Sequence, residues 1–71
     1  MHMRKLWRRS IGATLQEISK IIGVSPSLVS FWEKGTRVPS SQLNAAWKAA
    51  LVELEQRSRK RVEEAKHGHS G

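Results

Sequence analysis

The side chains best equipped for chemistry in this sequence are cationic. Thirteen Lys and Arg stand against six Glu, with no Asp, so the 71-residue chain carries a formal net charge of +7. Eight of the cations and two of the Glu fall in residues 1–48, whereas five cations and four Glu fall in residues 49–71. Because the excess positive charge is concentrated in the first two thirds of the chain, the sequence indicates a polyanionic partner for that part.

The same inventory gives no basis for a catalytic or metal site. There is no Cys or Asp and no Gly-rich loop that could cradle a phosphate, so we expect neither an enzyme nor a cofactor. His67 and His69 could bind a metal, but they stand in a short Gly-Ser tail and the chain has no Cys or Asp to join them, so we expect no metal. No apolar run approaches the roughly 20 residues of a membrane span. We therefore expect a cytoplasmic protein without a membrane partner.

Local signals predict helices throughout the first half of the chain. A short helix over residues 4–10 is expected to end at Gly12, because glycine adopts the left-handed conformation at no steric cost. A second helix is expected to begin after Thr14, since Glu17 three residues later completes a capping box. Gly23 is expected to end it.

Two further helices follow from the same kind of signal. Ser25 is a capping residue and Pro26 stands at the first helical position, where its missing N–H costs nothing. This third helix is expected to end at Gly35. Ser40 or its neighbour caps a fourth helix over residues 42–66, which contain no Gly or Pro and are rich in Ala, the best helix former.

The predicted fold is therefore all-α, a compact bundle of four to five helices with a central helix-turn-helix and an extended last helix. Residues 4–54 form the domain, residues 55–66 a helical extension and residues 67–71 a disordered tail. A domain this small buries only about 60% of its unfolded surface, so dimerisation would add stability. Apolar residues of the last helix are the expected contacts of a homodimer: Trp47, Leu51 and Leu54.

The centre of the chain combines a helix, the turn Gly23-Val24-Ser25 and a second helix. Further residues, spread over residues 4–54, complete a recognisable pattern: Arg8, Gly12, Thr14, Ile18, Ser19, Ile22, Val29, Ser30, Trp32, Glu33, Lys34, Gly35, Arg37 and Pro39. Through these residues the sequence resembles the lambda-repressor-like, or Cro/repressor-type, helix-turn-helix family.

The resemblance implies a sequence-specific protein that binds double-stranded DNA as a homodimer. It implies a small transcriptional repressor or regulator, acting on a bacterial nucleoid or encoded by a phage or plasmid. Because the sequence offers no second domain to hold one, we expect no small-molecule effector. Its recognition helix, about Pro26–Lys34, would enter the major groove. The positions implied to read bases are Ser27, Leu28, Ser30 and Phe31. Those implied to contact phosphate are Thr14, Gln16, Lys34, Thr36 and Arg37. The family also pairs an Arg of the first helix with the Glu of the Trp-Glu motif, which here would be Arg8 with Glu33.

The sequence departs from the family pattern at the positions that read bases. Leu15 replaces the usual Gln, and Leu28 and Phe31 stand where polar readers are common. Apolar side chains can contact thymine methyl groups, and readout of DNA shape can add specificity. Two alternatives therefore stay open. One is a protein-interaction module, such as an antitoxin or adaptor, and the other is an accessory DNA-architecture or recombination factor.

Overall fold

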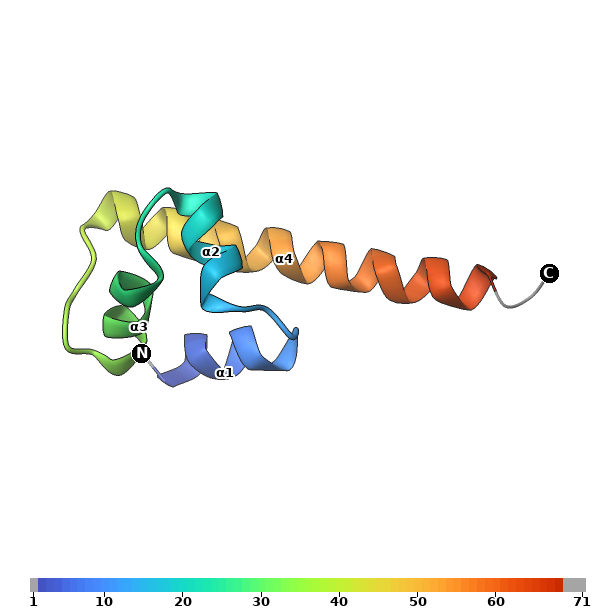
Figure 1. Ribbon diagram of the computed structural model, residues 1–71, viewed down its shortest axis with the longest axis horizontal. Coiled ribbons are helices and arrows are strands. Elements are labelled where there is room, and N and C mark those ends of the chain that lie inside the picture. Colours follow the sequence, from blue (N-terminus) through green and yellow to red (C-terminus); the bar gives the residue numbers. More distant parts are fainter. Residues whose placement is uncertain (1, 69–71) are drawn as a thin grey trace.

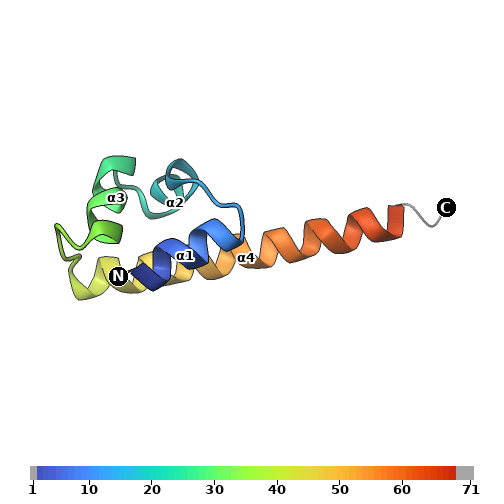
Figure 2. The ribbon, with the colours of Figure 1, turned by 90° about the horizontal axis from the view of Figure 1, so that it is seen from below.

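The computed structural model describes the backbone of residues 2–68 and the side chains of residues 3–61. This part of the chain forms α1 (His2–Ser10), α2 (Leu15–Ile22), α3 (Pro26–Lys34) and α4 (Ser41–Gly68), and it contains no strand. The first three helices gather around the N-terminal half of α4, and its C-terminal half extends away from them (Figures 1 and 2). The prediction of an all-α bundle with an extended last helix is confirmed, with four helices.

The ends of α2 and α3 follow the capping signals in the sequence. At the start of α2, Thr14 Oγ1 accepts a hydrogen bond from Glu17 N at 3.1 Å, and Glu17 Oε1 accepts one from Thr14 N at 2.9 Å. These two reciprocal bonds complete the expected capping box. At the start of α3, Ser25 Oγ accepts from Leu28 N at 3.2 Å beside Pro26. The helix-turn-helix is thus built by short-range interactions that the sequence specifies.

Glycine makes the turn between α2 and α3 possible. Gly23 has φ 90°, a left-handed conformation that residues with a Cβ rarely adopt, and its N–H donates to Ser19 O at 2.8 Å. The following N–H, of Val24, donates to the same carbonyl at 3.1 Å. Both bonds satisfy the Ser19 carbonyl near the end of α2 and turn the chain directly into the cap of α3.

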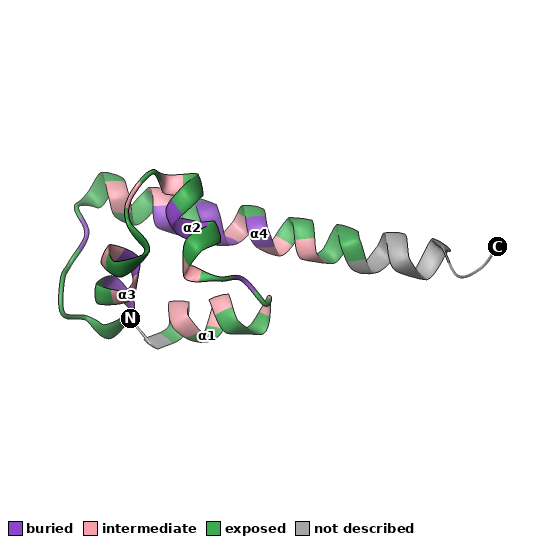
Figure 3. Ribbon diagram, in the orientation of Figure 1, coloured by how far each residue is buried: buried purple, intermediate pink, exposed green. Residues whose placement is uncertain are grey.

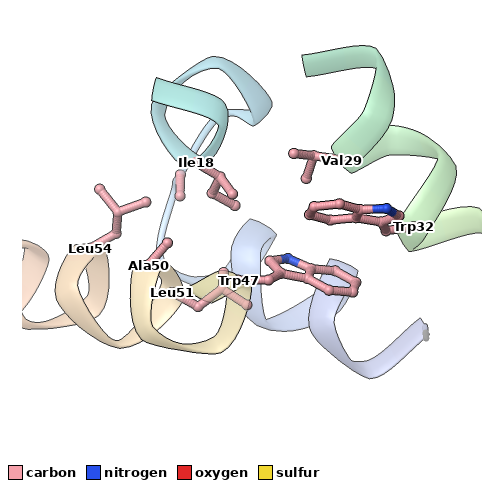
Figure 4. Packing of buried hydrophobic residues seen from close by; sticks show 8 residues of the cluster. Ile18, Val29, Trp32, Trp47, Ala50, Leu51 and Leu54 are labelled. Carbon is pink, nitrogen blue, oxygen red and sulfur yellow. The ribbon is translucent and has the colours of Figure 1, made fainter. Parts of the chain in front are cut away.

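The core lies where α2, α3 and α4 face one another. Ile18 of α2 and Val29 of α3 are completely buried, and they pack beside Trp32 of α3 and Trp47 of α4 (Figure 4). The centroids of the two indole rings lie 5.5 Å apart at an interplanar angle of 42°. Such tilted aromatic pairs add stabilisation beyond the area they bury. Most of the buried residues belong to α2, α3 and α4, and two more, Ala13 and Pro39, lie in the loops (Figure 3).

The core placement corrects the expectation for the dimer contact. Trp47 and Leu51 have no exposed surface and Leu54 is only 5% exposed, all within a single chain. A side chain that is already buried has no apolar surface left to give to a second copy. These three residues are therefore core residues and leave no apolar surface for a second copy.

Side chains of α1 attach it to α4 over long sequence distances. The guanidinium carbon of Arg4 lies 4.6 Å from the centre of the Trp47 ring, and Arg4 Nη1 donates to Asn44 Oδ1 at 2.6 Å. Trp7 Nε1 donates to Glu55 Oε2 at 3.0 Å. Glu55, expected at the start of a separate extension, thus takes part in the packed domain.

The last helix is longer than its sequence pattern predicts. It was expected to end near residue 66, and its backbone continues through His67 and Gly68. The rest of the expected tail, residues 69–71, lies outside the described residues, as do the side chains of His67 and His69. No helix within the described part of the chain is long and apolar enough to cross a membrane.

Candidate nucleic-acid interface

One side of α3 packs into the core and the opposite side is left open. Val29, Trp32 and Glu33 are buried. At 100° per residue, the side chains on the opposite side share one face of the helix. This α3 face consists of Ser27, Ser30, Phe31 and Lys34. Its largest member, Phe31, keeps 37% of its surface exposed. The helix thus presents hydroxyl groups, an aromatic ring and a cation side by side.

The α3 face continues onto two neighbouring side chains and becomes a depression. Leu15, at the start of α2, and Pro26, at the start of α3, line it together with the four residues of the α3 face. Its apolar side chains are those of Leu15, Pro26 and Phe31, whereas Ser27, Ser30 and Lys34 are polar. A surface of this composition can hold a small apolar group next to hydrogen-bonding partners.

Leu28 lies apart from the other three residues expected to read bases. It is half-buried and packs against the core cluster rather than lining the depression. The depression is lined instead by Leu15 and Pro26, neither of which was among the expected base readers. The spacing of Pro26, Ser30 and Lys34, four residues apart on one helix face, is the signal that could have identified Pro26.

The loop after α3 fixes a cation beside the depression. Thr36 N donates to Phe31 O at 3.0 Å, which ties the start of the loop back onto α3. The guanidinium carbon of Arg37 lies 5.5 Å from the centre of the Phe31 ring, within the range of a cation–π interaction. Thr36 and Arg37 are both exposed. A positive charge therefore stands at the edge of the α3 face.

The first turn of α2 offers backbone donors near the same surface. The N–H groups of Leu15 and Gln16 have no acceptor inside the helix, because the first residues of any helix lack one. The side chains of Thr14 and Gln16 are exposed. The Glu17 carboxylate already accepts from both the N–H and the hydroxyl of Thr14, at 2.9 and 3.2 Å. An anion at this end of α2 therefore has the N–H groups of Leu15 and Gln16 available to it.

Arg8 and Glu33 form the ion pair that the resemblance implied. Arg8 Nε and Nη2 donate to the two carboxylate oxygens of Glu33 at 2.6 and 3.1 Å, and Arg8 Nη1 donates to Ala13 O at 3.0 Å. The pair joins α1 to α3, so Arg8 serves the fold. By contrast, Lys20, Lys34 and Arg37 are exposed and have no ion-pair partner within residues 3–61.

Comparison with known proteins agrees with this geometry. The helix-turn-helix family model, of the lambda-repressor and Cro type, matches residues 5–43, more than half of the chain. An uncharacterised HTH-type transcriptional regulator of Archaeoglobus fulgidus is 33% identical over 49 residues, which cover 69% of this chain. The chain spans 21% of that relative's length. No solved structure matches significantly. The chain belongs to the helix-turn-helix family.

Proposed function

We propose that this helix-turn-helix protein binds duplex DNA with α3 in the major groove and acts as a small transcriptional repressor. The observation that carries the proposal is the α3 face, which is open, faces away from the core, contains the cation Lys34 and has Arg37 at its edge. An α-helix fits the width of the major groove, where base edges differ in sequence-specific ways. The name of the archaeal relative, a transcriptional regulator, supports the regulatory role.

The depression next to α3 suggests what the helix reads. Among its members only Ser27, Ser30 and Lys34 can form hydrogen bonds with base edges, and a Ser hydroxyl does not discriminate strongly between bases. The apolar wall of Leu15, Pro26 and Phe31 suits the methyl group that distinguishes thymine in the major groove. We therefore expect a preference for thymine at the position that meets Phe31, with DNA shape contributing elsewhere.

Phosphate contacts are proposed on both sides of this depression. The N–H groups of Leu15 and Gln16 at the start of α2 can receive one phosphate, with the side chains of Thr14 and Gln16 beside them. Lys34, Thr36 and Arg37 at the end of α3 can receive the phosphates of the opposite wall of the groove. Such contacts set the position of the protein on DNA and contribute affinity for any sequence.

The function also favours two copies acting together. One module of this size makes few phosphate contacts, and helix-turn-helix proteins gain affinity by binding two half-sites about 34 Å apart on one face of the duplex. The proposed operator is therefore two-fold symmetric, with each copy reading one half-site.

A protein partner is the second candidate, because the same depression is apolar on one wall. An antitoxin or adaptor could place Leu15 and Phe31 against a protein surface. The two candidates differ in the chemistry of binding. A DNA complex loses affinity steeply as salt rises, whereas an apolar protein contact does not.

Selection of bound duplexes from a random pool tests the proposal directly. We expect enrichment of a thymine-containing motif arranged as two inverted halves. The variant Phe31→Ala should still enrich DNA while losing the preference at one position of each half. Failure of the wild-type chain to enrich any duplex, with the fold intact by circular dichroism, would contradict the proposal.

A further inference from the structure

The depression beside α3 has an apolar wall that can contact a methyl group on any base. The wall is formed by Leu15, Pro26 and Phe31, whose side chains have no hydrogen-bonding group. It can therefore sense that a methyl group is present but not which base carries it. In the major groove the methyl group of thymine is bonded to C5 of the pyrimidine ring. 5-Methylcytosine carries a methyl group on the same ring atom.

The hydroxyl groups beside the wall do not tell these two pyrimidines apart. Thymine presents the acceptor O4 next to its methyl group, whereas cytosine and its methylated form present the donor N4–H₂ at that place. A Ser hydroxyl can donate one hydrogen bond and can also accept, because its hydrogen rotates to suit the partner. Ser27 and Ser30 can therefore donate to O4 of thymine or accept from N4 of 5-methylcytosine.

Both hydroxyl groups are available to adapt in this way. Ser10 of α1 and Ser19 of α2 donate to carbonyl groups of their own helices, at 2.7 and 2.9 Å. Within residues 3–61, the hydroxyls of Ser27 and Ser30 have no hydrogen-bond partner. No internal hydrogen bond therefore fixes either of them as a donor or as an acceptor.

The remaining polar member of the depression, Lys34, also tolerates the change of base pair. Replacing thymine with 5-methylcytosine replaces the paired adenine with guanine, so the donor N6–H₂ becomes the acceptor O6, and N7 stays an acceptor. The Lys34 ammonium has three donors and no acceptor. It is exposed and has no ion-pair partner within the part of the chain whose side chains are described. Guanine thus offers Lys34 one acceptor more than adenine does.

We propose that the depression recognises the 5-methyl group of either pyrimidine, so that the chain binds duplexes containing 5-methylcytosine as well as duplexes containing thymine. The inference rests on the proposed binding of α3 in the major groove, and it adds a second class of ligand, DNA methylated at cytosine. An unmethylated cytosine at the same position buries no methyl group against the wall. The methylation state of that cytosine therefore sets the affinity of the chain for the duplex.

Four duplexes test the inference through measured affinities. They match the selected operator except at one thymine, the one whose preference Phe31→Ala abolishes. That thymine is kept or replaced with deoxyuridine, cytosine or 5-methylcytosine, each opposite its pairing base. Thymine and deoxyuridine differ only by the methyl group, as do 5-methylcytosine and cytosine. We expect the wild-type chain to bind the methylated member of each pair about fourfold more tightly, because burial of one methyl-sized group is worth about that factor.

Two variants separate recognition of the methyl group from general affinity. Phe31→Ala should bind both members of each pair alike, because the depression has lost its largest apolar side chain. Ile21→Ala removes an apolar side chain of α2 that is 39% exposed and lies outside the depression, and it should keep both preferences. Circular dichroism checks that both variants are folded. Loss of both preferences in Ile21→Ala would show that they do not come from the depression, which contradicts the proposal.

The outcomes distinguish this inference from the proposed function. Equal affinity for cytosine and 5-methylcytosine, with thymine still preferred over deoxyuridine, would overturn the inference and leave DNA binding in place. So would a 5-methylcytosine duplex bound no better than a scrambled one, or a selected motif without a thymine that depends on Phe31. Absence of binding to every duplex would overturn the proposed function, and this inference with it.

Discussion

Arg8 and Glu33 bind each other through two hydrogen bonds, from Nε to Oε2 at 2.6 Å and from Nη2 to Oε1 at 3.1 Å. Their side chains are 14% and 4% exposed. Glu33 belongs to α3 and Arg8 to α1, so the pair holds the helix of the proposed DNA interface against the rest of the fold. A charge buried to this degree is tolerated because its partner is present.

Removing either partner should destabilise the domain strongly. We expect Arg8→Ala or Glu33→Ala to lower the free energy of unfolding by about 3–5 kcal/mol, because the remaining charge is stranded. The double variant should lose less than the sum of the two, which urea denaturation can measure. Arg57→Ala is a matched control, since its pair with Glu53 is exposed and worth at most about 1 kcal/mol. Strict additivity of the two single changes would disprove the coupling.

Arg37 and Phe31 should have separable effects on DNA binding. Arg37→Ala should weaken binding to all duplexes alike, because a phosphate contact carries no sequence information. Phe31→Ala should change the selected motif. Arg61→Ala removes the same charge from an exposed site on α4 and should leave affinity closer to the wild-type value. An Arg37→Ala variant with altered motif and unchanged general affinity would reverse the assignment. Band-shift titrations on selected and scrambled duplexes give both quantities.

The apolar depression predicts sensitivity to a single methyl group. Replacing the thymine that meets Phe31 with deoxyuridine removes only the 5-methyl group and should weaken binding about fourfold, the equivalent of about 0.8 kcal/mol. The same replacement should matter little to Phe31→Ala, whose depression has lost one wall. Equal affinity of the wild-type chain for the thymine and deoxyuridine duplexes would show that the methyl group is not recognised.

The two sides of α4 should respond differently to truncation of apolar side chains. Leu51→Ala should cost about 2–5 kcal/mol of folding stability, because Leu51 is fully buried. Val52→Ala, on the outward side, should cost less than about 1 kcal/mol, because Val52 is only half-buried. Thermal and urea denaturation at micromolar concentration compare the two. A larger loss for Val52→Ala than for Leu51→Ala would contradict the orientation of α4.

The parts of the fold that could be predicted are those set by neighbours in sequence. The capping box of Thr14 and Glu17, the cap at Ser25 and the left-handed Gly23 are short-range features, so the sequence contains all the residues involved within a few positions. The turn between α2 and α3 follows from them. The pairing of Arg8 with Glu33, 25 residues apart, came instead from the resemblance to a family.

The parts of the fold that could not be predicted depend on which helix surfaces pack against each other. An apolar stripe shows that one side of α4 is covered, but not by what, so Leu51 and Leu54 were assigned to a dimer when the rest of the chain covers them. The bond between Trp7 and Glu55, 48 residues apart, has no local signal at all.

The dependence of binding on salt tests the central claim, recognition of DNA by a cationic helix-turn-helix surface, most directly. The measurement is the affinity of the wild-type chain for its selected duplex between low and moderate salt. If about 4–8 phosphates are neutralised, log K should fall against log salt with a slope of roughly −4 to −7. Arg37→Ala should make that slope shallower by about 1. A flat dependence for the wild-type chain, or no binding to any duplex at low salt, would contradict DNA as the partner.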